Sequence, residues 1–202
     1  MKESNGKTIA LVALAISVVG LGVGFASFTK TLTIKPAATV KPTDDTFNVK
    51  FTSNGGKVSA TATTGATGDD ATVTDTTVEG IKANFTAPGQ SVSYTIPVLN
   101  DGEYVAYLNS INFGNGVSCT AGTSNTLVAE ACKGIEVSVK VGTDTAVTAT
   151  TSNITGHKLA NTTNSNTENA VVTISYKEGS ARADQDFEVT IDAITLTYGT
   201  AD

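Results

Sequence analysis

The sequence has few of the residues that enzymes and metalloproteins most often use as catalytic groups or metal ligands. Its 202 residues include one histidine (His157), two cysteines, no tryptophan and a single methionine, at position 1. One histidine and two cysteines are too few for a zinc site built from those ligands alone. A Cys–His pair or a Ser–His–Asp triad would also have to converge on His157. We therefore expect a non-enzymatic protein with no metal site and no other cofactor.

Charged residues are scarce, and acidic residues outnumber basic ones. There are 13 lysine and arginine residues against 19 aspartate and glutamate residues, so the formal net charge is −6. A nucleic-acid-binding protein needs a basic face that neutralises phosphates, and this composition argues against such a partner. The most abundant residue is threonine, with about 35 copies. Threonine is favoured in β-strands and suits their outward faces.

One long apolar run lies near the N-terminus. Positions 8 to 28 carry no charge, and two lysines precede them. About 20 apolar residues can cross a bilayer as a helix, and a basic start before an apolar run is also typical of a signal peptide. Small residues end the run and predict cleavage between Ala26 and Ser27. Residues 1–26 are thus expected to be a signal peptide or a retained membrane anchor. Residues 27–202 are then an extracellular or cell-surface domain.

The exported part alternates apolar and polar residues with the period of a β-strand. Apolar residues share one face in the following runs: Phe28, Leu32 and Ile34; Phe47, Val49 and Phe51; Ile81, Ala83 and Phe85; Val92, Tyr94, Ile96 and Val98; Ile135, Val137, Val139 and Val141. Many short strands separated by turn signals predict an all-β protein. We expect a single antiparallel β-sandwich, immunoglobulin-like or jelly-roll-like, preceded by the N-terminal hydrophobic helix.

Local signals predict the connections between these strands. Residues 87–90 (APGQ) predict a type II turn in which Gly89 has a positive φ. Residues 100–102 (NDG) predict a hairpin that pairs the strands on either side. Apolar parity shifts within the last strand and predicts a bulge near residues 192–193. Residues 126–132 (TLVAEAC) are expected to form one or two helical turns.

Cys119 and Cys132 are the only cysteines, and the export signal places them outside the cytoplasm. An intramolecular disulfide is therefore predicted. A metal pair would lack further ligands, and a redox pair normally has the spacing C-x-x-C.

Two other groups of residues have the chemistry of possible sites. The acidic pairs Asp44-Asp45, Asp69-Asp70 and Asp184/Asp186 carry carboxylates of the kind that bind Ca²⁺, but none has EF-hand spacing. Solvated loops are the simpler interpretation of all three pairs. A catalytic or metal-binding role for His157 would need partners that the sequence does not indicate. An enzyme would require a cluster of titratable groups around that histidine in a pocket.

Two stretches resemble secreted bacterial proteins. The first is GFASFTKTLTI, a small-residue exit that leads directly into a strand and is followed by FNVKFTS. The second, APGQSVSYTIPVLNDGEYVAYLNSI at 87–111, is similar to the strand–turn–strand signature of secreted immunoglobulin-like repeats. With the closing ITLTYG, the chain resembles small exported proteins of Gram-positive bacteria related to the TasA/camelysin biofilm-fibre group. Camelysin has been described as a metalloprotease, but this sequence has no HExxH motif, and that activity is not carried over.

The resemblance implies a jelly-roll subunit that polymerises by donating its N-terminal strand to a neighbour. By position, the donor strand is 27–35, with Phe28, Leu32 and Ile34 on its apolar face. The expected partner is therefore a second copy of the chain, together with other matrix or cell-surface components, and the membrane is contacted only through the N-terminal segment. A cell-surface binding module or adhesin that presents its loops to a glycan or host ligand remains the alternative.

Overall fold

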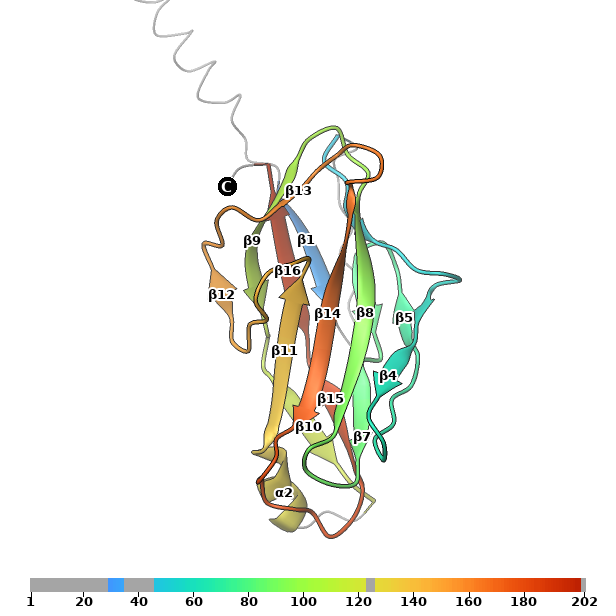
Figure 1. The fold of residues 1–202 in the computed structure, drawn as a ribbon, viewed down its shortest axis with the longest axis vertical. Helices are drawn as coiled ribbons and strands as arrows, with labels where there is room; N and C mark the ends of the chain where they lie inside the picture. Colours follow the sequence, from blue (N-terminus) through green and yellow to red (C-terminus); the bar gives the residue numbers. More distant parts are fainter. Residues whose placement is uncertain (1–28, 35–45, 123–125, 201–202) are drawn as a thin grey trace, which may run out of the picture.

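The computed structural model describes residues 29–34, 46–122 and 126–200 (Figure 1). The predicted N-terminal helix, the cleavage site between Ala26 and Ser27, and Phe28 lie outside these residues. In the described part of the chain, no helix combines the length and apolar character needed to cross a membrane.

The described residues form short and medium strands and one short helix. In chain order these are β1 (Thr29–Ile34), β2 (Val49–Phe51), β3 (Lys57–Val58), β4 (Ala60–Ala62), β5 (Ala71–Val73), β6 (Thr77–Glu79), β7 (Lys82–Phe85), β8 (Ser91–Asn100), β9 (Ala106–Asn112), β10 (Val117–Thr120), α2 (Thr126–Cys132), β11 (Ile135–Val141), β12 (Thr151–Ser152), β13 (Lys158–Leu159), β14 (Thr167–Tyr176), β15 (Phe187–Ile191) and β16 (Ile194–Gly199).

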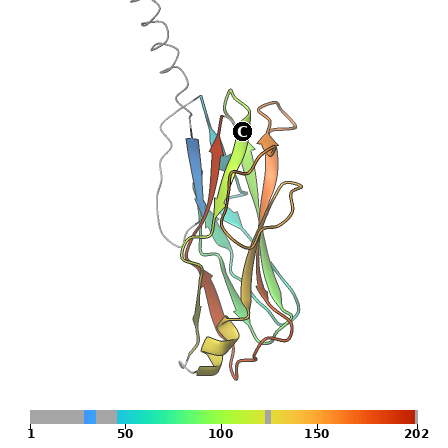
Figure 2. The same ribbon diagram turned by 90° about the vertical axis from the view of Figure 1, so that its left-hand side faces the viewer.

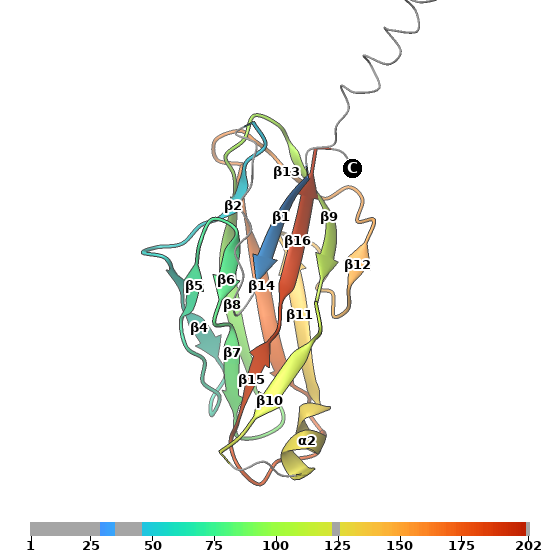
Figure 3. The same ribbon diagram turned by 180° about the vertical axis from the view of Figure 1, so that it is seen from behind.

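The strands pack as two layers, which the side view in Figure 2 separates. One layer has the order β11-β14-β8-β2, with β4 also paired to β8. The other has the order β12-β9-β16-β1-β6-β5-β3, with β13 also on β9, and it continues below as β10-β15-β7 (Figure 3). Among the described strands, β1 and β6 are parallel and the other pairs are antiparallel. The prediction of an all-β, sandwich-like architecture is confirmed at this level.

The core is built from the alternating residues that the sequence places inward. On β8, the side chains of Val92, Tyr94, Ile96 and Val98 are all fully buried. At the lower end of the sandwich, the ring of Tyr176 lies 5.4 Å from that of Phe187, centroid to centroid, and their planes are nearly perpendicular. Full burial of an apolar side chain stabilises the fold by about 1.5–3 kcal/mol, so this alternation accounts for much of the driving force.

Several of the predicted connections are confirmed. Gly89 has φ 87°, a left-handed conformation that a side chain would strain, as the predicted turn requires. The helical turns expected at 126–132 are α2. The bulge predicted near residues 192–193 is instead a break, because β15 ends at Ile191 in one sheet and β16 begins at Ile194 in another. This break lets the inward parity shift by one residue without burying a charge.

The hairpin predicted at residues 100–102 is wrong, because β8 pairs with β14 whereas β9 pairs with β16 in the other layer. The side chain of Asn100 is fully buried and explains this crossing. Its Oδ1 accepts a hydrogen bond from the backbone N–H of Gly102 at 3.1 Å. Its Nδ2 donates to the carbonyl oxygens of Tyr104 at 2.8 Å and Leu159 at 3.1 Å. These bonds hold the chain as it passes from one layer to the other.

Candidate functional site

Strand β1 is the described part of the predicted donor strand, and it lies between two other strands of its own chain. It pairs antiparallel with β16 over six residues, from Thr29 opposite Gly199 to Ile34 opposite Ile194. On its other side it pairs in parallel with β6. Leu32 is 0% exposed, as expected for a residue on the apolar face. β1 is therefore paired along its whole length with β16 but only at Thr33 and Ile34 with β6, and the Leu32 side chain fills a position in the core.

The position occupied by β1, between β16 and β6, is called here the β1 slot. Without β1, both neighbouring strands would present unpaired backbone groups, and the core would lose the Leu32 side chain. The same strand from a second copy of the chain would make the same pairings in that copy's slot. In this structure the β1 slot is filled by the chain's own strand.

A groove lies between the edges of the two layers. In the sheets formed by the described residues, β10 and β11 are both terminal strands. Between them is a cavity of about 300 Å³, with apolar lining from Phe113, Val117, Ile135, Val137 and Ile191. We call it the lateral groove.

The upper and lower parts of the β11 edge differ. Val139 exchanges both of its outward backbone hydrogen bonds with Val147, at 2.9 Å each. Alternation along an antiparallel strand puts the backbone groups of Val137 on the same outward side, where they face the lateral groove. The upper edge is therefore covered by a later segment, whereas the lower edge borders the groove.

The predicted disulfide is present, in the part of the chain that connects β10 to β11. It joins Cys119 on β10 to Cys132 at the end of α2, with a Cα–Cα distance of 6.0 Å. The helix connects β10 to β11 and contributes two buried residues, Val128 and Ala131. Leu127 on the same helix is 48% exposed. The disulfide thus fixes a helix that has only a small apolar contact with the sandwich.

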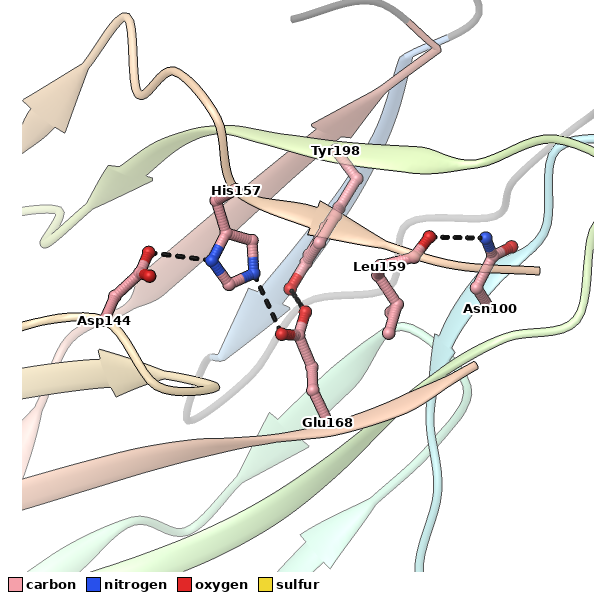
Figure 4. A network of polar contacts seen from close by, with 6 residues as sticks. All are labelled: Asn100, Asp144, His157, Leu159, Glu168 and Tyr198. Carbon is pink, nitrogen blue, oxygen red and sulfur yellow. Dashed lines mark hydrogen bonds and ion pairs between the residues drawn. The ribbon is translucent and has the colours of Figure 1, made fainter. Parts of the chain in front are cut away.

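His157 has partners that the sequence did not indicate. Its side chain is only 7% exposed. Its Nδ1 lies 2.7 Å from Oδ2 of Asp144, and its Nε2 lies 2.8 Å from Oε2 of Glu168 (Figure 4). The other oxygen of Glu168 accepts a hydrogen bond from the Tyr198 hydroxyl at 2.8 Å. We call these four residues the His157 bridge.

The geometry of the His157 bridge favours a charged imidazolium. A carboxylate oxygen can only accept, so both ring nitrogens must carry hydrogen for both bonds to form. The hydrogen bond to Glu168 is the main cause that raises the pKa of His157 above its ordinary value of 6.5. The negative charges of Glu168 and Asp144 act in the same direction, and burial opposes them. Burial, with the charge of Glu168, raises the pKa of Tyr198 well above 10.0, which keeps its hydroxyl hydrogen in place.

The His157 bridge is the kind of cluster of titratable groups that an enzyme would require, and in this structure its members bond to one another. Because both nitrogens of His157 are engaged, neither offers a lone pair to a metal ion or to a substrate proton. Among the described residues, no group of three or more histidine, cysteine, aspartate or glutamate side chains could hold a metal ion. The histidine and its two carboxylates connect three successive parts of the chain: the turn after β11, the loop before β13 and the start of β14.

The acidic pairs considered as calcium ligands do not converge on one another. Asp69 lies 3.0 Å from the Lys82 ammonium, which also lies 2.9 Å from Glu188. The hydrogen bond to Glu188, followed by that to Asp69, raises the pKa of Lys82 and keeps its charge in place. Asp184 and Asp186 are exposed in the loop before β15. The pair at 44–45 lies outside the described residues.

The position of Glu168 in the His157 bridge could have been inferred from the sequence. On β14, Ala170 and Val172 face inward, and Glu168 continues the same parity toward the strand's start. A carboxylate on an inward face needs a hydrogen-bonding partner. Asp144 has no such signal, because it lies in a turn after β11 and only the path of the chain brings it to His157.

No family model, no curated protein and no solved structure matches the chain. Its function has to be inferred from its own strands, edges and side chains.

Proposed function

We propose that this chain is a non-enzymatic extracellular structural protein, a subunit of a surface fibre or biofilm matrix, and that it assembles by exchanging its N-terminal strand. In this proposal residues 1–26 direct export, the exported domain is a jelly-roll or immunoglobulin-like sandwich, and the principal partner is a second copy. Support comes from the resemblance of residues 24–34 and 87–111 to the TasA/camelysin group and from the position of β1.

The observation that supports strand exchange most is the insertion of β1 between β16 and β6. β1 pairs with β16 over six residues and with β6 at Thr33 and Ile34, and Leu32 is fully buried. When a neighbour supplies the strand, every one of these contacts is kept. The change in free energy is then small, and association is controlled by protein concentration.

Directional exchange leads to a fibre. If each copy donates β1 to the next and accepts one from the previous copy, the contact joins two different surfaces and does not close on itself. A reciprocal exchange between two copies would instead give a closed dimer. The lateral groove offers a further uncovered edge for contacts between neighbouring fibres.

Protein that begins at Ser27 is expected to form filaments whose amount rises with concentration, because strand exchange is intermolecular. Negative-stain microscopy and size-exclusion chromatography of a dilution series measure this. Microscopy of native cell-surface material, with N-terminal sequencing of the protein found there, gives the same information for the natural assembly.

Two outcomes would contradict the proposal. One is a monodisperse monomer under all assembly conditions, both with and without residues 27–35. The other is a monomer that binds a glycan or host surface and loses this binding when loop 57–77 or 160–169 is deleted. The second outcome would favour the binding module.

A further inference from the structure

We propose that the His157 bridge is a pH-dependent fastening for residues 142–160, which cover the upper edges of β11 and β9, and that raising the pH releases this cover. The inference is independent of the proposed function, because it concerns a single copy of the chain. Residues 142–160 are called the cover segment below.

The cover segment spans the opening between the two layers. It begins beside β11, where Val147 pairs with Val139. It continues as β12 and β13, both of which pair with β9 in the other layer. Figure 1 shows the segment running outside the sandwich, from the end of β11 toward β13. It therefore occupies the upper part of the same side of the sandwich on which the lateral groove is open.

Most residues of the cover segment are exposed, and backbone hydrogen bonds make up most of its contacts with β9 and β11. Among the apolar residues of 142–160, all of which are described, Leu159 is buried, and Val147 and Ile154 are partly buried against the core. The strands β12 and β13 have two residues each. A segment with so few buried apolar contacts opens locally at a lower free energy than the core. A charged bridge can therefore contribute a large share of its stability.

The His157 bridge fastens the cover segment at both of its ends. Asp144 lies near the start of the segment and His157 near its end, so their ion pair ties the two ends together. Glu168 then connects the ring to β14 in one layer, and Tyr198 connects Glu168 to β16 in the other. These are the titratable groups that contact the imidazole, directly or through Glu168, from the elements packed around it. Figure 4 shows the ring between the two carboxylates.

The turn at the start of the cover segment is shaped closely around this bridge. Gly142 has φ 54°, and a Cβ built there would lie 2.8 Å from Oε2 of Glu168 and 3.3 Å from Cε1 of His157. A side chain at this position would displace the carboxylate that holds the ring. The backbone at Gly142 therefore lies directly against the Glu168 carboxylate and the His157 ring.

The direction of the pH effect follows from the protonation of the ring. The Glu168 hydrogen bond raises the pKa of His157 in the folded protein above 6.5. The stability that the bridge contributes is then fully present below pH 6.5, the pKa of histidine in the unfolded chain. It is lost as the pH rises through the higher pKa that His157 has in the folded protein. A neutral imidazole carries only one N–H, so one of the two carboxylates loses its donor. The cover segment is therefore expected to open more often at a pH above the pKa of His157 than below it.

Amide hydrogen exchange and the NMR titration of His157 test this in the full exported chain at low concentration, between pH 5 and pH 9. The amides of Leu108, Val139 and Val147 report on the cover segment, since each takes part in a backbone bond between the segment and β9 or β11. After correction for intrinsic exchange, their opening equilibrium should rise about tenfold for every unit by which the measured pKa of His157 exceeds 6.5. The amide of Tyr94 in the core should show no such change.

The variant Glu168→Gln should lower the pKa of His157 and flatten the pH dependence at the three reporter amides. Glu130→Gln is the matched control, because Glu130 pairs with Lys133 on the exposed surface, far from the bridge. Reporter protection that is the same at pH 5 and pH 9 in the wild type would overturn the inference. So would a pH dependence that Glu168→Gln leaves unchanged. The wild-type series decides the matter by itself if the variant does not fold, and neither result depends on filament formation.

Discussion

Leu32→Ala is expected to lower the free energy of unfolding by about 2–5 kcal/mol. The side chain is 0% exposed and is carried by β1 between β16 and β6. Truncation removes buried methyl groups and leaves a cavity, and the strands on both sides limit how far the site can collapse. Urea denaturation monitored by circular dichroism measures the loss.

Leu32 makes the same contacts whether β1 lies in its own chain or in a neighbour, so the substitution should destabilise monomer and filament by similar amounts if β1 is the exchanged strand. Leu127→Ala is the matched control, since Leu127 is 48% exposed on α2. We expect its effect on the unfolding free energy to stay within about 0.5 kcal/mol. A loss below about 1 kcal/mol for Leu32→Ala would show that β1 does not contribute to the stability of the domain.

Replacing both Cys119 and Cys132 by serine is expected to cost about 3 kcal/mol. The two residues are 13 positions apart, and a cross-link over a loop of this size restricts the unfolded chain by about that amount. Packing of α2 in the folded state compensates for little of this lost stability, because α2 buries only Val128 and Ala131. The double substitution avoids leaving one reactive thiol.

Reduction of the wild-type disulfide should give a similar loss, which separates the cross-link from the effect of serine itself. Thermal unfolding with and without reductant measures it. Equal unfolding temperatures for oxidised and reduced protein would mean that the α2 region unfolds independently of the sandwich.

The inward faces of the strands could be predicted because period-2 alternation is a local property. Every second residue of β8 is buried for the reason visible in its sequence, and the same holds for Phe47, Val49 and Phe51. The Gly89 turn and the break at 192–193 are local as well. The disulfide could be predicted because the chain has only two cysteines and its N-terminal apolar run predicts export.

Long-range partnerships were not predictable in this way. The NDG signal at 100–102 indicates a tight turn, but it does not say whether the next strand joins the same layer. Asn100 decides this through its bonds to Tyr104 and Leu159, and Leu159 is 59 residues away. Asp144 and Glu168 likewise reach His157 only because the chain crosses from β11 to β9 and returns to β14.

Strand exchange through the β1 slot is the central claim, and one cross-linking measurement tests it most directly. Thr31 and Thr197 are Cα partners in the β1–β16 pairing, so Thr31→Cys with Thr197→Cys places two thiols at the junction. Oxidation before assembly should join each strand to its own chain and prevent filaments, and reduction should restore them. Thr31→Cys alone is the control for incidental cross-links.

Oxidation after assembly gives the deciding result. If β1 of one copy occupies the slot of the next, non-reducing gels of the oxidised filaments should show a ladder of covalent oligomers. Filaments that contain only the cross-link within single chains would contradict strand exchange, since β1 would then remain in its own sheet while the fibre forms by another contact.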